Sequence, residues 1–100
     1  MAYWRDNQSD NIDDANVQGR QAVAATAAAL ASGAAYKHWL IWPDAGAADT
    51  HYRFTTAGTA ATTSYPKLAA ADTMERHFDT AQKCSMIGAA ATGSINVVAW

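Results

Sequence analysis

The last third of the chain consists of short stretches in which apolar and polar residues alternate. These stretches cover residues 73–78, 83–87 and 94–100, with turn-forming residues before and between them. Alternation with a period of two places successive side chains on opposite faces of an extended chain, as in a half-buried β-strand. Strands in succession predict a β-meander whose last two strands pair as a hairpin. The expected fold is all-β, a small antiparallel β-sandwich or barrel.

Further strands are predicted upstream of this region. Residues 36–42 form an aromatic-rich run that ends in a Pro-Asp turn. Residues 51–55 alternate, which directs Tyr52 and Phe54 inward. The short loop between these two runs predicts that they pair as a hairpin. A short edge strand is expected near residues 59–63.

The alanine-rich segment that precedes these strands allows two interpretations. Alanine is the best helix former, which favours a helix over about residues 15–32 and an α+β fold. However, Val17, Val23 and Leu30 do not form the continuous apolar stripe of an amphipathic helix. Because the downstream pattern is β, we favour a strand over residues 20–27 and a second extended piece near Leu30.

Residues 1–16 are predicted to form an extended N-terminal arm, followed by a single β domain over residues 17–100. The arm is rich in Asp and Asn and has few side chains to bury. Aromatic and arginine side chains are enriched where proteins contact one another. On this basis the candidate contact residues are Tyr3, Trp4, Arg5, Ile12, Trp39, Trp42 and Trp100.

Large aliphatic side chains are scarce, because about a quarter of the chain is alanine. At ~25 cal/mol per Å² of buried apolar surface, an alanine methyl group contributes little to stability. The core is therefore expected to depend on Tyr36, Trp39, Ile41, Tyr52, Phe54, Phe78, Met86, Ile87 and Val97. Such a core is thin, and contacts with neighbouring subunits are expected to complete it.

Charge and cysteine content exclude several classes of protein. The net charge is −2 and the basic residues are dispersed, which disfavours nucleic-acid binding. Cys84 is the only cysteine, so the chain can form neither an intrachain disulfide nor a cysteine metal cluster, and assembly in a reducing cytoplasm is expected. No secretory signal and no apolar run of ~20 residues is present, so we expect a soluble protein without membrane contact.

The sequence offers little catalytic chemistry. Candidate metal ligands are His38, His51 and His77, with Asp44, Asp49 or Asp79. Their spacing matches no compact zinc pattern, and we predict no metal site. Cys84 alternates with Met86 as a packing residue would, and neither a nucleophile elbow nor a phosphate loop is present. We therefore predict a protein that is not an enzyme and needs no cofactor.

Three segments together resemble small virion proteins of tailed bacteriophages. They are residues 34–41 (AAYKHWLI), 65–72 (YPKLAAAD) and 84–100 (CSMIGAAATGSINVVAW). The resemblance implies a structural capsid decoration or cement protein that binds the outside of the capsid and reinforces contacts between capsid subunits. It implies the major capsid protein and further copies of the chain as partners, typically in a homotrimer. The protein would be made in the host cytoplasm and reside on the capsid surface.

Two alternatives to capsid decoration stay open. One is a head-fibre or tail-associated structural or adhesion module, which the same resemblance also covers. The other is a carbohydrate-binding β-sandwich, in which some of the four tryptophans would form a stacking platform for sugars. Tryptophan on a β surface more often packs in a core or a subunit interface, so carbohydrate is the less favoured partner.

Overall fold

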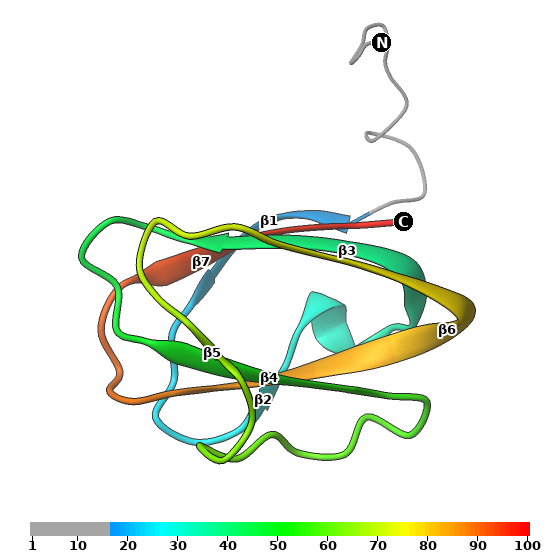
Figure 1. Ribbon diagram of the computed structural model, residues 1–100, viewed down its shortest axis with the longest axis horizontal. Helices are drawn as coiled ribbons and strands as arrows, with labels where there is room; N and C mark the ends of the chain where they lie inside the picture. Colours follow the sequence, from blue (N-terminus) through cyan, green and yellow to red (C-terminus); the bar gives the residue numbers. More distant parts are fainter. Residues whose placement is uncertain (1–16) are drawn as a thin grey trace, which may run out of the picture.

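The computed structural model describes residues 17–100, and this part of the chain is built from β-strands (Figure 1). The strands are β1 (Val17–Ala22), β2 (Ala28–Ala29), β3 (Tyr36–Pro43), β4 (Thr50–Thr55), β5 (Lys67–Leu68), β6 (Met74–Gly88) and β7 (Ser94–Ala99). One 3₁₀ helix, η2 (Ala31–Gly33), follows β2. The predicted all-β class is confirmed, and residues 17–100 contain no α-helix. The predicted arm, residues 1–16, lies outside the described residues.

All strand pairs are antiparallel, in the order β1-β7-β3-β6-β4-β5, and β2 also pairs with β6. The strands form two layers that face each other (Figure 1). One layer contains β1, β7, β3 and the first part of β6. The other contains the second part of β6 with β2, β4 and β5. Strand β6 therefore belongs to both layers and joins them.

The length of β6 corrects the prediction of two strands over residues 73–78 and 83–87. They are parts of one strand that pairs with β3 through residues 74–77 and Gln82, and with β4 through residues 83–88. The segment between them, Asp-Thr-Ala-Gln, contains no glycine or proline to end a strand. The strand turns over from one layer to the other there, as its curved yellow part shows in Figure 1.

Both predicted hairpins are wrong. Strands β3 and β4 do not pair, because β3 lies between β7 and β6, whereas β4 lies between β6 and β5. Strands β6 and β7 do not pair either, since β3 separates them, and the predicted meander is therefore wrong. The loops after β3 and after β6 cross between the two layers instead of closing a turn within one of them. The edge strand expected near residues 59–63 is absent, and this stretch is an irregular loop.

The alternative of a helix over about residues 15–32 is wrong for its described part. The strand predicted over residues 20–27 is also misplaced, because β1 ends at Ala22 and residues 23–27 are irregular. Strand β1 pairs with β7 along its whole length, from Val17 opposite Ala99 to Ala22 opposite Ser94. The short strand β2 confirms the extended piece expected near Leu30. Tertiary pairing with β6 and β7 therefore outweighs the helix propensity of alanine.

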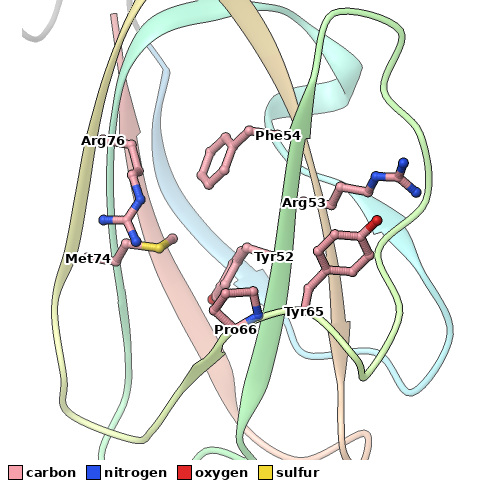
Figure 2. A pocket seen from close by; sticks show the side chains of 7 residues that line it. All are labelled: Tyr52, Arg53, Phe54, Tyr65, Pro66, Met74 and Arg76. Carbon is pink, nitrogen blue, oxygen red and sulfur yellow. The ribbon is translucent and has the colours of Figure 1, made fainter.

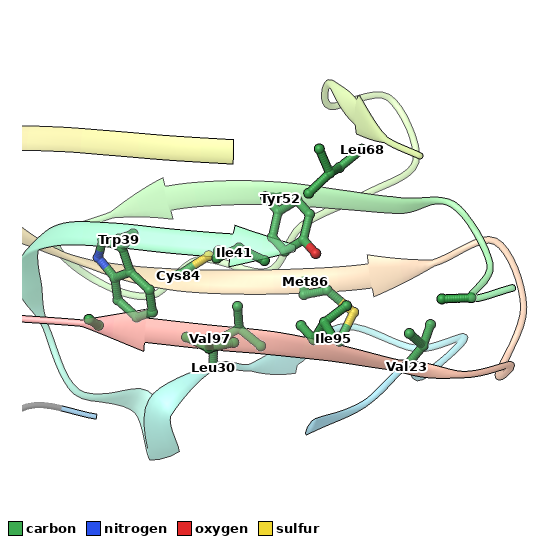
Figure 3. Close-up of a cluster of buried hydrophobic side chains, with 12 residues drawn as sticks. Val23, Leu30, Trp39, Ile41, Tyr52, Leu68, Cys84, Met86, Ile95 and Val97 are labelled. Carbon is green, nitrogen blue, oxygen red and sulfur yellow. The ribbon is translucent and has the colours of Figure 1, made fainter. Parts of the chain in front are cut away.

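The hydrophobic core lies between the two layers (Figure 3). Its largest fully buried side chains include Trp39 and Ile41 from β3, Met86 from β6 and Ile95 from β7. The complete cluster is Val23, Leu30, Trp39, Ile41, Ala47, Tyr52, Leu68, Cys84, Met86, Ile95, Val97 and Ala99. Five of the nine predicted core residues belong to it. Of the others, Tyr36, Phe54 and Phe78 are partly buried against it, and Ile87 lies outside it.

Candidate interaction surface

The outward side of the layer that contains β3 and β7 carries an apolar row. Side chains alternate along each strand. Because Trp39 and Ile41 of β3 face the core, His38, Leu40 and Trp42 face outward. Antiparallel pairing places Leu40 opposite Val98 and Trp42 opposite Asn96. The backbone of His38 exchanges hydrogen bonds of 3.0 and 3.1 Å with that of Trp100. We call this surface the outer face. It comprises His38, Leu40, Trp42, Asn96, Val98 and Trp100.

Trp100 is the most exposed large apolar side chain of the described residues, with 37% of its surface accessible. Its indole ring stacks on the imidazole of His38, with ring centroids 5.2 Å apart and an angle of 5° between the planes. Leu40 and Trp42 are half-buried, and Val98 is buried. A rigid sheet thus presents an aromatic and aliphatic strip with one ring held in a fixed orientation.

A polar group borders the outer face at the Trp42 end. Arg20 on β1 forms an ion pair with Asp44, which follows β3. The side-chain amide of Asn96 donates hydrogen bonds to Asp44 Oδ1 at 2.8 Å and to the backbone oxygen of Trp42 at 3.0 Å. This network connects β1, β7 and the end of β3, and it fixes the polar end of the face.

A second polar group borders the opposite end. Pairing of β3 with β6 places His38 opposite His77, and the two imidazole rings meet edge to face with centroids 4.6 Å apart. His77 Nε2 lies 3.0 Å from Glu75 Oε2. Within residues 17–100, no cluster of three or more His, Cys, Asp or Glu able to hold a metal ion occurs. His51 lies apart from this pair, with Nδ1 2.7 Å from the backbone oxygen of Tyr65.

The seven predicted contact residues fall into three groups. Trp42 and Trp100 share the outer face. Trp39 is fully buried in the core, so it has no surface to offer a partner and is removed from the set. The other four, Tyr3, Trp4, Arg5 and Ile12, lie outside the described residues. Leu40 was missed, because its place on the outer face depends on the pairing of β3 with β7, which the sequence pattern did not predict.

A groove of about 410 Å³ opens between the layers on another side of the molecule. Its walls are β4, the loop before β5 and the first part of β6, and its lining residues are Tyr52, Arg53, Phe54, Tyr65, Pro66, Met74 and Arg76. Figure 2 shows Met74 and Arg76 on one side of this space, facing Phe54, Tyr52 and Pro66. The groove lies beside the first part of β6, where residues 74–77 pair with β3 and not with β4. We call it the β4–β6 groove.

Burial shifts the pKa values of two side chains, Tyr52 and Cys84. Burial raises the pKa of Tyr52 to about 12, and a hydrogen bond of 2.8 Å that the Thr50 hydroxyl donates to the phenol oxygen partly opposes this shift. Burial also raises the pKa of the Cys84 thiol above its ordinary range. With 1% of its surface accessible, Cys84 packs in the core as predicted. A thiol in this setting is a poor nucleophile.

Comparison with known proteins gave no match: no family model, curated protein or solved structure is significantly similar to this chain. Within the described residues, no helix is long and apolar enough to span a membrane. The outer face and the β4–β6 groove are therefore the two surfaces from which a function can be inferred.

Proposed function

We propose that this protein is a structural subunit that binds another protein through its outer face. The observation that carries the proposal is the strip formed by Leu40, Trp42 and Trp100, which the two-layer core does not use. Because β3 and β7 are each paired on both sides, this strip lies on a rigid support. Binding there would require little ordering of the backbone. A preorganised surface of this kind lowers the entropic cost of association.

The distribution of polarity on the outer face supports the same function. Apolar side chains occupy its middle, whereas the Arg20–Asp44 pair lies at one end and the His77–Glu75 pair at the other. Protein interfaces commonly have an apolar centre and a polar rim. Arginine, aspartate and histidine at the rim would orient a partner, while Leu40 and the two tryptophans between the polar ends would contribute most of the affinity.

For the biological setting, we propose decoration of a tailed-bacteriophage capsid, with the major capsid protein as the partner of the outer face. The support is the resemblance of three segments to small virion proteins, together with the all-β body. A decoration protein needs an apolar contact surface and no catalytic groups, and repeated weak contacts on a symmetric shell add up through avidity. Homotrimers and the capsid surface location belong to this proposal.

The test is retention on capsid shells. The chain is co-expressed with the major capsid protein of the same genome, shells are purified by density gradient, and bound chain is quantified against shell protein. Trp100→Ser is expected to lower affinity at least about tenfold, because truncation of a hot-spot tryptophan in an interface costs about 2 kcal/mol or more. Lys37→Ser is the control, since Lys37 is exposed on β3 but does not belong to the outer face. Absence of the chain from shells would exclude capsid decoration.

Carbohydrate binding is the second candidate, and the exposed ring of Trp100 is the observation that favours it. Sugars stack on exposed aromatic rings, and Trp100 is already held parallel to His38. Titration of the chain with oligosaccharides, followed by tryptophan fluorescence, separates the two functions. A saturable spectral shift that Trp100→Ser removes, without retention on shells, would favour sugar binding over capsid decoration.

A further inference from the structure

We propose that the β4–β6 groove of one copy binds residues 1–16 of a second copy, so that the chain self-associates edge to edge. The first observation concerns charge. Four aspartates and one arginine give residues 1–16 a net charge of −3, whereas six basic and five acidic side chains give residues 17–100 a net charge of +1. The two parts of the chain thus carry net charges of opposite sign, which favours contact between them.

The groove presents one of these basic side chains at an apolar wall. Arg76 lines it beside Met74 and faces Phe54 (Figure 2). Its guanidinium donates to the backbone oxygen of Glu75 at 3.0 Å, and it forms no ion pair within residues 17–100. The Glu75 carboxylate itself is directed to His77, at the border of the outer face. Arg76 is thus available to a carboxylate that approaches along the groove.

The segment carries the matching pair of side chains. Trp4 and Asp6 are two residues apart, so they lie on the same side of an extended chain. Met74 and Arg76 have the same spacing on β6. An extended segment along β6 would place the indole against the apolar wall and the carboxylate beside the guanidinium. A groove of about 410 Å³ has room for an aromatic side chain.

The backbone beside the groove also has capacity for another strand. Residues 74–77 pair with β3 on one side, and β4 pairs with β6 only from Lys83 onward. Within the described residues, no strand pairs with the second edge of this stretch. Unpaired backbone donors and acceptors at a sheet edge are satisfied by addition of an extended segment.

The positions of the two edges favour binding between copies. Val17 begins β1, at the edge of the layer opposite β6, with β7 and β3 between them. At ~4.8 Å between neighbouring strands, this separation is about 14 Å, and the groove opens on the inner side of β6. The start of β1 and the groove thus lie at opposite edges of this layer, which is the arrangement that head-to-tail contact between copies requires. Such head-to-tail contacts close into a ring when the rotation fits, as in a trimer.

The experiment measures self-association of the full chain by sedimentation velocity over a range of concentrations at low and moderate salt. We expect a concentration-dependent oligomer that salt weakens. Arg76→Glu and Asp6→Arg are each expected to weaken association about tenfold or more, and the double variant is expected to recover most of it. Lys37→Glu makes the same charge change at an exposed position outside the groove and is expected to have no effect. Circular dichroism verifies that every variant is folded.

Three results would overturn the proposal: a chain that is monomeric at every concentration, association that Arg76→Glu leaves unchanged, or a double variant no better than either single one. The inference rests on the proposed function only in treating the protein as part of an assembly. A monomeric chain that still binds capsid shells would refute the groove contact and retain the function of the outer face. An oligomer that shows the expected variant pattern but does not bind shells would support the groove contact and refute capsid decoration.

Discussion

Trp39 offers the sharpest test of how the core holds the two layers together. Its indole N–H lies 3.2 Å from the backbone oxygens of both Tyr36 and Gln82, so it connects the start of β3 to the bend of β6. The ring also packs edge to face on Phe54 of the opposite layer, with centroids 5.9 Å apart. Trp39→Phe removes the donor and part of the ring volume while keeping an aromatic side chain.

The expected loss of stability has two parts. Loss of the donor leaves two backbone oxygens beside a buried site without this partner, which costs about 1–2 kcal/mol. The smaller ring leaves a space that the neighbours fill only in part, at a cost of roughly 1 kcal/mol. Together, about 2–3 kcal/mol corresponds to a melting temperature lower by roughly 10–20 °C for a domain of this size.

Trp42→Phe is the matched control, because it makes the same chemical change three residues away on the outer face. Trp42 is half-buried, and its contact with Asn96 uses the backbone oxygen, which the substitution keeps. Its expected cost is below about 1 kcal/mol. Both variants are compared with the unchanged chain by urea and thermal unfolding, followed by circular dichroism. Equal losses for the two variants would refute the role assigned to Trp39.

Three further predictions follow from backbone conformation and burial. Gly93→Ala is expected to lower the free energy of unfolding by about 2 kcal/mol or more, measured in urea, because φ is +82° and the added Cβ would lie 2.6 Å from Ala47 Cα. Gly46→Ala, with φ +88° but open space around it, should cost about half as much. Cys84 should react with a thiol reagent only on unfolding, so the modification rate should follow denaturant concentration, and rapid modification of the folded protein would contradict its burial. Burial raises the pKa of Tyr52 from 10.0 to about 12, so the folded state retains a proton that the unfolded chain releases first. The resulting stabilisation is complete below about pH 10 and is lost as the pH rises to about 12, by about 2–3 kcal/mol for two pKa units. Tyr52→Phe should remove this part of the alkaline destabilisation, and an unchanged pH profile would count against it.

The candidate sites could be predicted only in part from the pattern of residue types. Four tryptophans suggested contact surfaces, and two of them, Trp42 and Trp100, do lie on one face. The pattern of β3 shows that Trp39 and Trp42 point to opposite sides, but both sides carry apolar residues. Which side is buried depends on the layer that covers it, and this is not encoded in the strand itself. The β4–β6 groove could not be predicted at all, because its walls are far apart in sequence and meet only where β6 bends.

Alternation and turn residues act locally, so the amino-acid sequence predicts the β class and the approximate positions of most strands. Which strands are neighbours follows from contacts made in the folded chain. A sequence pattern shows that a strand has two faces, but hydrogen bonding between strands depends on residues distant in the chain. The meander predicted for the last third illustrates this: its first two runs form the single strand β6, and β3 lies between β6 and β7. The strand that crosses both layers creates the core, the outer face and the groove together, and none of these is a local property of the chain.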